Sequence, residues 1–171
     1  TNYIAYKSFT AITTGTVYLS YLYQANGDQG QTASEILGLS NSATNSAVKI
    51  WAGKQLDGTK NPFRIGLTRS STSSTDIVWC STTLSTSNVY LIVIKYDLAT
   101  TTASLFINPV VGTVVEPTAD VTAATDGTAR TSIGYLMFKH NGSSVAKFYT
   151  SGVRVSTTWA EAVASQSVAP Q

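Results

Sequence analysis

The sequence holds few of the residues that build covalent or ionic frameworks. Among its 171 residues are one cysteine, one histidine, one methionine and four prolines, and 12% are charged, against about a quarter in ordinary globular proteins. A single cysteine excludes a disulfide framework and a cysteine-rich zinc site. A net charge of +2 is too small to indicate nucleic-acid binding. No apolar run reaches the ~18 residues of a membrane-spanning helix. We therefore expect no nucleic-acid partner and no membrane insertion.

Hydroxyl side chains are what the chain has in abundance. It contains 26 threonines and 21 serines, and 43% of its residues are hydrophobic. That hydrophobic fraction is too high for a disordered chain. Threonine favours strands because it is β-branched, and serine and threonine hydroxyls satisfy the backbone of turns. This composition predicts a soluble, β-rich domain, and a hydroxyl-rich surface with few charges is typical of secreted or cell-surface proteins.

Short strand-like segments separated by turn residues recur along the whole chain. Residues 48–52 and 63–69 alternate between apolar and polar positions, whereas residues 89–96 are apolar on both faces and are expected in the middle of a sheet. Gly38, inside another such segment, predicts a bulge or a close approach of two backbones. The other expected strands are residues 3–9, 17–23, 35–39, 77–80, 103–107, 132–139 and 145–155, and residues 110–131 are expected to be irregular.

One short helix is expected near the C-terminus. Thr157 or Thr158 can cap it, Glu161 stands three residues after Thr158 as a capping box requires, and Trp159 begins an apolar stripe. About ten short strands and one helix predict an all-β fold, a two-sheet antiparallel sandwich, over residues 1–164 as a single domain. Residues 165–171 are expected to form a tail or linker.

Three segments together resemble a known family. They are residues 88–98 (NVYLIVIKYDL), 103–109 (ASLFINP) and 152–163 (GVRVSTTWAEAV), in the order in which laminin-G-like, concanavalin A-like jelly-roll domains of secreted bacterial proteins carry similar segments. The resemblance implies two curved antiparallel sheets with a concave face. Members of this superfamily bind glycans or proteins, act as spacers or hydrolyse polysaccharides, and fold alone does not choose among these functions.

The residues that catalysis would need are scattered. Jelly-roll glycosidases need two carboxylates facing a scissile bond, and residues i and i+2 of one strand could supply them. No expected strand carries two acidic residues, and the three glutamates are far apart in the sequence. His140 lies in a His-Asn-Gly turn, Cys80 lies in an apolar stretch, and no Gly-x-Ser-x-Gly elbow is present. We expect a protein that is not an enzyme.

The same resemblance raises the question of Ca²⁺, which laminin-G-like domains often hold through loop oxygens. The candidate ligands are Asn26, Asp28, Asp120 and Asp126, each within two residues of a glycine or threonine in an expected turn. Asparagine and aspartate are also common in turns without a metal. These four residues therefore have two interpretations: ligands of a bound Ca²⁺, or turn residues without a metal.

A carbohydrate is the expected ligand because sugar rings stack on exposed aromatic faces. Trp51 alternates with apolar residues and is expected to point outward, although a loop or a neighbouring domain could cover it. Trp79 could point either way, and Trp159 is expected to plug the core. Arg64 and Arg69 are the expected polar contacts because the arginine fork suits hydroxyl or carboxylate groups.

Two functions remain open from the sequence. The first is a non-catalytic, extracellular, carbohydrate-binding module that uses Trp51, Arg64, Arg69 and Trp79. The second is a structural or adhesive subunit of a surface fibre or multidomain adhesin, which would bind other protein domains or subunits. Residues 3–9 favour the second function slightly, because a strand at the very start of the chain could pair with the edge of another subunit.

Overall fold

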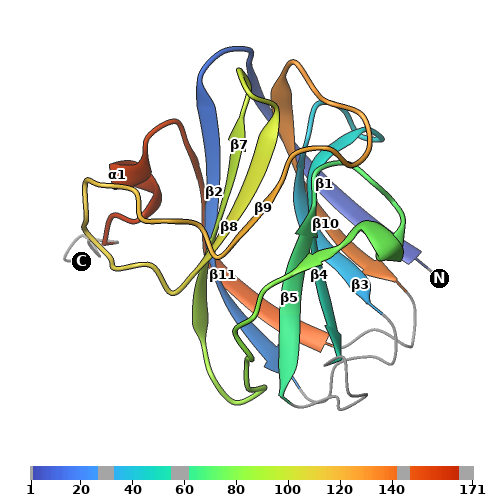
Figure 1. Ribbon diagram of the computed structural model, residues 1–171, viewed down its shortest axis with the longest axis vertical. Helices are drawn as coiled ribbons and strands as arrows, with labels where there is room; N and C mark the ends of the chain where they lie inside the picture. The colour runs from blue at the N-terminus through green and yellow to red at the C-terminus, as the bar shows by residue number, and fades with distance from the viewer. Residues whose placement is uncertain (1, 27–32, 55–61, 142–146, 166–171) are drawn as a thin grey trace.

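The computed structural model describes residues 2–26, 33–54, 62–141 and 147–165 (Figure 1). The described chain forms two antiparallel sheets that pack face to face. Sheet A has the order β1 (Asn2–Ile12), β10 (Ile133–Asn141), β3 (Ser34–Ser40), β4 (Ser46–Lys54), β5 (Phe63–Thr68) and β6 (Val78–Trp79). Sheet B has the order β11 (Lys147–Ser156), β2 (Thr16–Asn26), β7 (Tyr90–Asp97), β8 (Thr102–Ile107) and β9 (Val121–Ala123).

These strands follow the expected apolar segments closely. Residues 110–131, expected to be irregular, contain the three-residue strand β9. So short a strand has no periodicity by which its sequence could predict it. A short 3₁₀ helix, η1 (Ser74–Asp76), precedes β6. The candidate calcium ligand Asp28, residues 142–146 between β10 and β11, and tail residues 166–171 lie outside the described residues.

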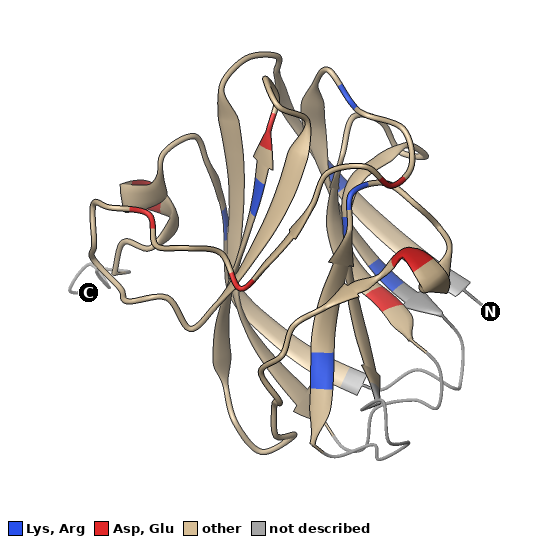
Figure 2. Cartoon of the chain, viewed as in Figure 1, with Lys and Arg blue, Asp and Glu red and all other residues tan. Residues whose placement is uncertain are grey.

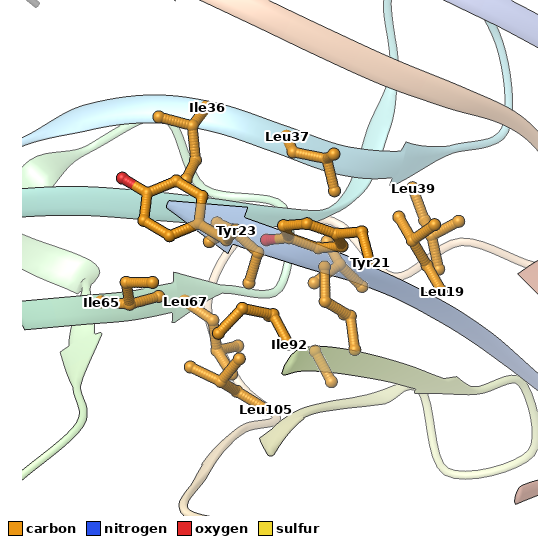
Figure 3. Packing of buried hydrophobic residues seen from close by; sticks show 14 of the residues in the cluster. Leu19, Tyr21, Tyr23, Ile36, Leu37, Leu39, Ile65, Leu67, Ile92 and Leu105 are labelled. Atoms are coloured by element: carbon orange, nitrogen blue, oxygen red, sulfur yellow. The ribbon is translucent and has the colours of Figure 1, made fainter. Parts of the chain in front are cut away.

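The main core lies between the two sheets. Alternate residues of β2, namely Leu19, Tyr21 and Tyr23, point into it, and leucines and isoleucines from both sheets surround them (Figure 3). The inward phase expected for β5 is confirmed, because Phe63, Ile65 and Leu67 are all fully buried. Burying each such aliphatic or aromatic side chain contributes about 1.5–3 kcal/mol.

A bulge in β3 decides which of its side chains face outward. The pairing of β3 with β4 shifts between Glu35 and Leu37, so that Ile36 and Leu37 both join the core while Glu35 remains on the outer face. Of the two alternatives expected at Gly38, the close approach of two backbones is confirmed: a Cβ there would lie 2.2 Å from the carbonyl oxygen of Val48, whereas Gly38 itself pairs in register with Lys49. Only glycine allows the two backbones to approach so closely.

The helix α1 (Trp159–Ala162) covers part of the outer face of sheet B. Its predicted cap is confirmed, because the Thr158 side chain accepts a hydrogen bond from the Glu161 N–H. Trp159 is buried as expected, but in a second cluster outside the sandwich, with its ring centroid 4.8 Å from that of Phe106. No helix in the described part of the chain has the length and apolar character of a membrane span.

Candidate functional site

Three of the four residues expected to bind a ligand meet on the outer face of sheet A. Trp51 on β4 pairs with Gly66 on β5, and Gly66 pairs with Trp79 on β6. Arg64, two residues before Gly66, pairs with Gly53. Because directly paired residues project from the same face, the two tryptophans and the arginine share one surface. We call this surface the β4–β6 shelf.

The expectation that Trp51 offers an exposed ring is wrong. Trp51 is 6% exposed, and its indole N–H donates a hydrogen bond to Thr68 Oγ1 at 3.0 Å. The segment that follows β5 folds back over this face, and a Cβ on Gly66 would lie 2.6 Å from Cγ2 of Ile77. Trp51 therefore points outward, as its alternation predicts, but a loop covers it. Coverage of Trp51 by a loop was one of the alternatives that the sequence left open.

Trp79 is the half-buried member of the shelf. The rim of its indole lies against the two glycines, because a Cβ on Gly53 would come within 2.9 Å of Cη2 and one on Gly66 within 3.0 Å of Cε3. Without side chains at these glycines, the ring packs directly on the strand backbones. Arg64 is also half-buried, and its Nε is buried with no hydrogen-bond partner. The shelf thus joins a half-buried apolar ring to a half-buried guanidinium group.

Arg69 serves the fold, which corrects its assignment as a ligand contact. Its side chain is buried and donates hydrogen bonds to the carbonyl oxygens of Asp126 (2.8 Å) and Gly127 (2.7 Å). The Asp126 carboxylate in turn accepts the backbone N–H of Arg69 at 2.7 Å. These reciprocal bonds join the loop after β5 to the loop after β9. The Arg69 donors that a sugar would need are used inside the protein.

The described calcium candidates are not gathered into one site. The carboxylate of Asp126 is held by the Arg69 loop, whereas that of Asp120 accepts the backbone N–H of Ile107 at 2.7 Å. Asn26 donates to the hydroxyl of Tyr149 at the far end of sheet B. Among the described residues, no three histidines, cysteines, aspartates or glutamates come close enough to share an ion. Asn26, Asp120 and Asp126 therefore have separate structural partners.

A charged cluster beside the shelf was missed from the sequence. Glu35 on β3 is 1% exposed, and its Oε2 lies 2.8 Å from Lys139 Nζ and 3.8 Å from Lys49 Nζ. Its other oxygen, Oε1, is buried without a partner. Burial lowers the pKa of the Lys49 amine, and the Glu35 charge partly opposes that shift. The outward phase of Lys49 was readable, but the pairing of β3 with β4 and β10 was not.

The other two glutamates also have structural partners. Glu116 accepts the hydroxyl of Tyr18 at 2.5 Å and binds Lys95 Nζ at 2.8 Å, and burial together with this carboxylate raises the pKa of Tyr18. The Glu161 carboxylate accepts the hydroxyl of Thr158 at the start of α1. Figure 2 shows how sparsely charged residues are distributed over both sheets. The side chain of His140 lies outside the described set, and Cys80 is a buried free thiol, as expected.

Comparison with known proteins shows the fold. No protein-family model and no curated protein matches the chain. Among solved structures, a sialidase superposes with a TM-score of 0.61 at 9% identity over 94% of this chain, which spans 15% of the sialidase chain. A heptameric SAP-like pentraxin from Limulus polyphemus gives 0.49 at 11% identity (89% and 74% of the two chains). A tetrameric galectin from the ball sponge Cinachyrella sp. gives 0.43 at 11% identity (91% and 99%).

Sequence identities this low are evidence for the fold alone. The chain is a two-sheet antiparallel jelly-roll sandwich of the concanavalin A-like type with one short C-terminal helix, which confirms the fold class predicted from the sequence.

Proposed function

We propose that this protein is a non-catalytic, extracellular binding module of the laminin-G-like kind, and that it binds carbohydrate on the β4–β6 shelf. The observation that carries the proposal is the half-buried Trp79 ring, held on Gly53 and Gly66 beside Arg64, whose Nε has no partner. An apolar ring face accepts the C–H face of a sugar. A guanidinium fork donates hydrogen bonds to sugar hydroxyl or carboxylate oxygens.

The charge balance narrows the class of glycan. A net charge of +2 with few charges overall provides little long-range attraction, so recruitment of a highly acidic polymer by charge is not favoured. Among the described side chains of the shelf, Arg64 is the cation that is not bound to Glu35. A neutral polysaccharide, or one with an isolated carboxylate per repeat, is therefore the proposed ligand class.

The non-catalytic part of the proposal is supported by the surroundings of the three glutamates. Glu35 lies between two lysines, Glu116 is bound by Tyr18 and Lys95, and Glu161 caps a helix. Glycoside hydrolysis needs a carboxylic acid and a second carboxylate that face one substrate. These glutamates come from separate elements, and each already has partners within the fold.

A glycan array followed by titration calorimetry with the best polysaccharide tests the proposal. Trp79→Ala is expected to weaken binding about 5- to 30-fold, because a stacking aromatic contributes of the order of 1–2 kcal/mol. Arg64→Gln is expected to have a smaller effect of the same sign. Tyr149→Ala is the matched control, since Tyr149 is an exposed aromatic on sheet B. The absence of any glycan ligand, or an equal loss with Tyr149→Ala, would refute the assignment to the shelf.

A structural or adhesive subunit is the second candidate, and the exposure of β1 favours it. Ile4 and Tyr6 on this end strand are 50% and 56% exposed, and such apolar edges promote association. Sedimentation of the purified chain at rising concentration discriminates between the two. Long assemblies that Tyr6→Lys abolishes would support the subunit, whereas a monomer at millimolar concentration would exclude assembly of this chain with itself.

A further inference from the structure

The two open sides of the sandwich are built differently. On one side the sheets end in β6 and β9, which have two and three residues. On the other side they end in β1 and β11, which have 11 and 10 residues. Natural sheets commonly end in short strands because a long unpaired edge is a template for another chain. The β1/β11 side lacks that protection.

A cleft of about 890 Å³ opens between β1 and β11. Its apolar lining is Phe9 and Ile12 from β1, Leu136 from β10 and Val155 from β11, and all four side chains belong to the core or pack against it. The cleft therefore exposes the rim of the main core. Its volume is within the range of ligand sites.

Irregular pairing beside the cleft bends both bordering strands. The pairing of β1 with β10 shifts between Ser8 and Ile12, and that of β11 with β2 shifts between Ser151 and Arg154. A bulge bends its strand and increases the local twist. Both end strands thus change direction where the cleft lies, which leaves the core rim accessible from outside.

The free edge of β1 is the better site for a further strand. β1 pairs on one side with β10, and no strand formed by the described residues lies on its other side, so alternate backbone N–H and C=O groups lack partners among those strands. The helix segment lies close to β11, since the Arg154 side chain donates hydrogen bonds to the carbonyl oxygens of Glu161 and Ala164. An extended peptide on β1 would place alternate side chains toward the cleft.

The charge of the cleft indicates the chemistry of its occupant. Lys7 and Arg154 line it, and within the described parts of the chain neither takes part in an ion pair. The one acidic lining residue, Glu161, accepts the Thr158 hydroxyl at the helix cap. The unbalanced charge at the cleft is therefore positive, which suits a carboxylate on the incoming segment.

We infer that the β1/β11 cleft receives an extended peptide segment of another protein, which adds as a strand to the free edge of β1. The segment has apolar residues at alternate positions that fill the cleft, and an acidic residue that faces Lys7 and Arg154. Main-chain hydrogen bonds to β1 supply affinity, and the apolar floor and the two cations supply selectivity. This site lies at the opposite end of sheet A from the β4–β6 shelf, so it is independent of the glycan proposal.

The test uses a fluorescein-labelled nine-residue peptide in which valine and threonine alternate, with one aspartate at its centre, and follows fluorescence anisotropy. Two analogues accompany it: one with lysine in place of aspartate, and one with alternate backbone amides N-methylated so that the strand edge is blocked. The protein variants are Lys7→Glu, whose exposed side chain makes a folding defect improbable, and Tyr149→Ala as the control on sheet B.

The aspartate peptide is expected to bind the native chain and to bind Lys7→Glu about tenfold more weakly, while the lysine analogue shows the reverse preference. The N-methylated analogue should fail to bind, and Tyr149→Ala should bind normally. Equal binding of the N-methylated peptide would show that no strand is added. Failure of the aspartate peptide to bind at 1 mM, or a stable dimer through β1 that excludes the peptide, would also overturn the inference. None of these results would bear on the proposed binding of glycan at Trp79.

Discussion

The hydroxyl of Tyr21 is a polar group without a partner in the middle of the main core. Tyr21 is 1% exposed and lies at the centre of β2 between Leu19 and Tyr23 (Figure 3), and its oxygen is buried with no hydrogen bond. Burial raises the pKa of Tyr21 well above its ordinary value of 10.0, and Tyr23 adds to the shift. The substitution Tyr21→Phe removes this oxygen and leaves the ring in place.

The expected result at neutral pH is a more stable protein. An unpaired buried hydroxyl destabilises the folded state by about 1–3 kcal/mol. Deleting a buried methyl group costs about 1 kcal/mol, and the smaller void left by one oxygen costs less than that. We therefore expect Tyr21→Phe to raise the free energy of unfolding by about 1 kcal/mol. For a domain of this size that gain corresponds to about 2–4 °C in Tm.

Alkaline pH should widen the difference. Since the folded pKa of Tyr21 lies above 10.0, the unfolded chain loses the phenolic proton first. The stability linked to this proton is complete below pH 10 and falls as pH rises beyond it, by up to about 1.4 kcal/mol per pH unit. The lowered pKa of Lys49 acts oppositely below 10.5, since its unfolded form binds the extra proton there. Both proteins contain Lys49, so its contribution cancels in their difference.

Urea denaturation at pH 7, 10, 10.5 and 11, followed by tryptophan fluorescence, measures these quantities. Tyr96→Phe is the matched control, because Tyr96 is equally buried but its hydroxyl donates to the Arg130 carbonyl at 3.0 Å and accepts the Arg130 N–H at 2.8 Å. That variant should lose about 1–3 kcal/mol. A loss of stability of similar size in Tyr21→Phe would refute the reasoning, since it would mean that the Tyr21 hydroxyl is satisfied.

Three further variants test the cluster, the loop and the shelf. Glu35→Gln leaves Lys49 buried without its counter-charge and should lower the free energy of unfolding by about 3 kcal/mol in urea melts, less so as pH rises toward 10; no change at pH 7 would contradict the pairing. Arg69→Ala breaks the bonds to the Asp126 loop and should cost about 2–4 kcal/mol, with faster proteolysis of that loop; unchanged stability would contradict its structural role. Gly66→Ala places a Cβ 2.8 Å from the Val78 carbonyl oxygen and should displace β6, at a cost of about 1–3 kcal/mol, with a red-shifted Trp79 emission; native emission would refute the tight approach.

Local pattern alone determined much of this fold. Alternation along residues 48–52 and 63–69 assigned inward and outward faces, because successive side chains of a strand project from opposite sides. The glycine at position 38 marked the close approach of two backbones, and Thr158 with Glu161 marked the start of the helix, because these features depend on a few neighbouring residues. The class of fold followed from the number and spacing of such short strands.

The tertiary structure decided which of these side chains a ligand can reach. Alternation indicated that Trp51 faces away from the core, but the segment after β5, which reaches Ile77 at 26 positions along the chain from Trp51, covers that face. Arg69 and Asp126 looked like free surface groups until the fold joined loops 57 positions apart. The ion pairs of Glu35 with Lys49 and Lys139 likewise require β3 to lie between β4 and β10. Burial and partnership depend on contacts between distant segments, and no local pattern in one sequence contains them.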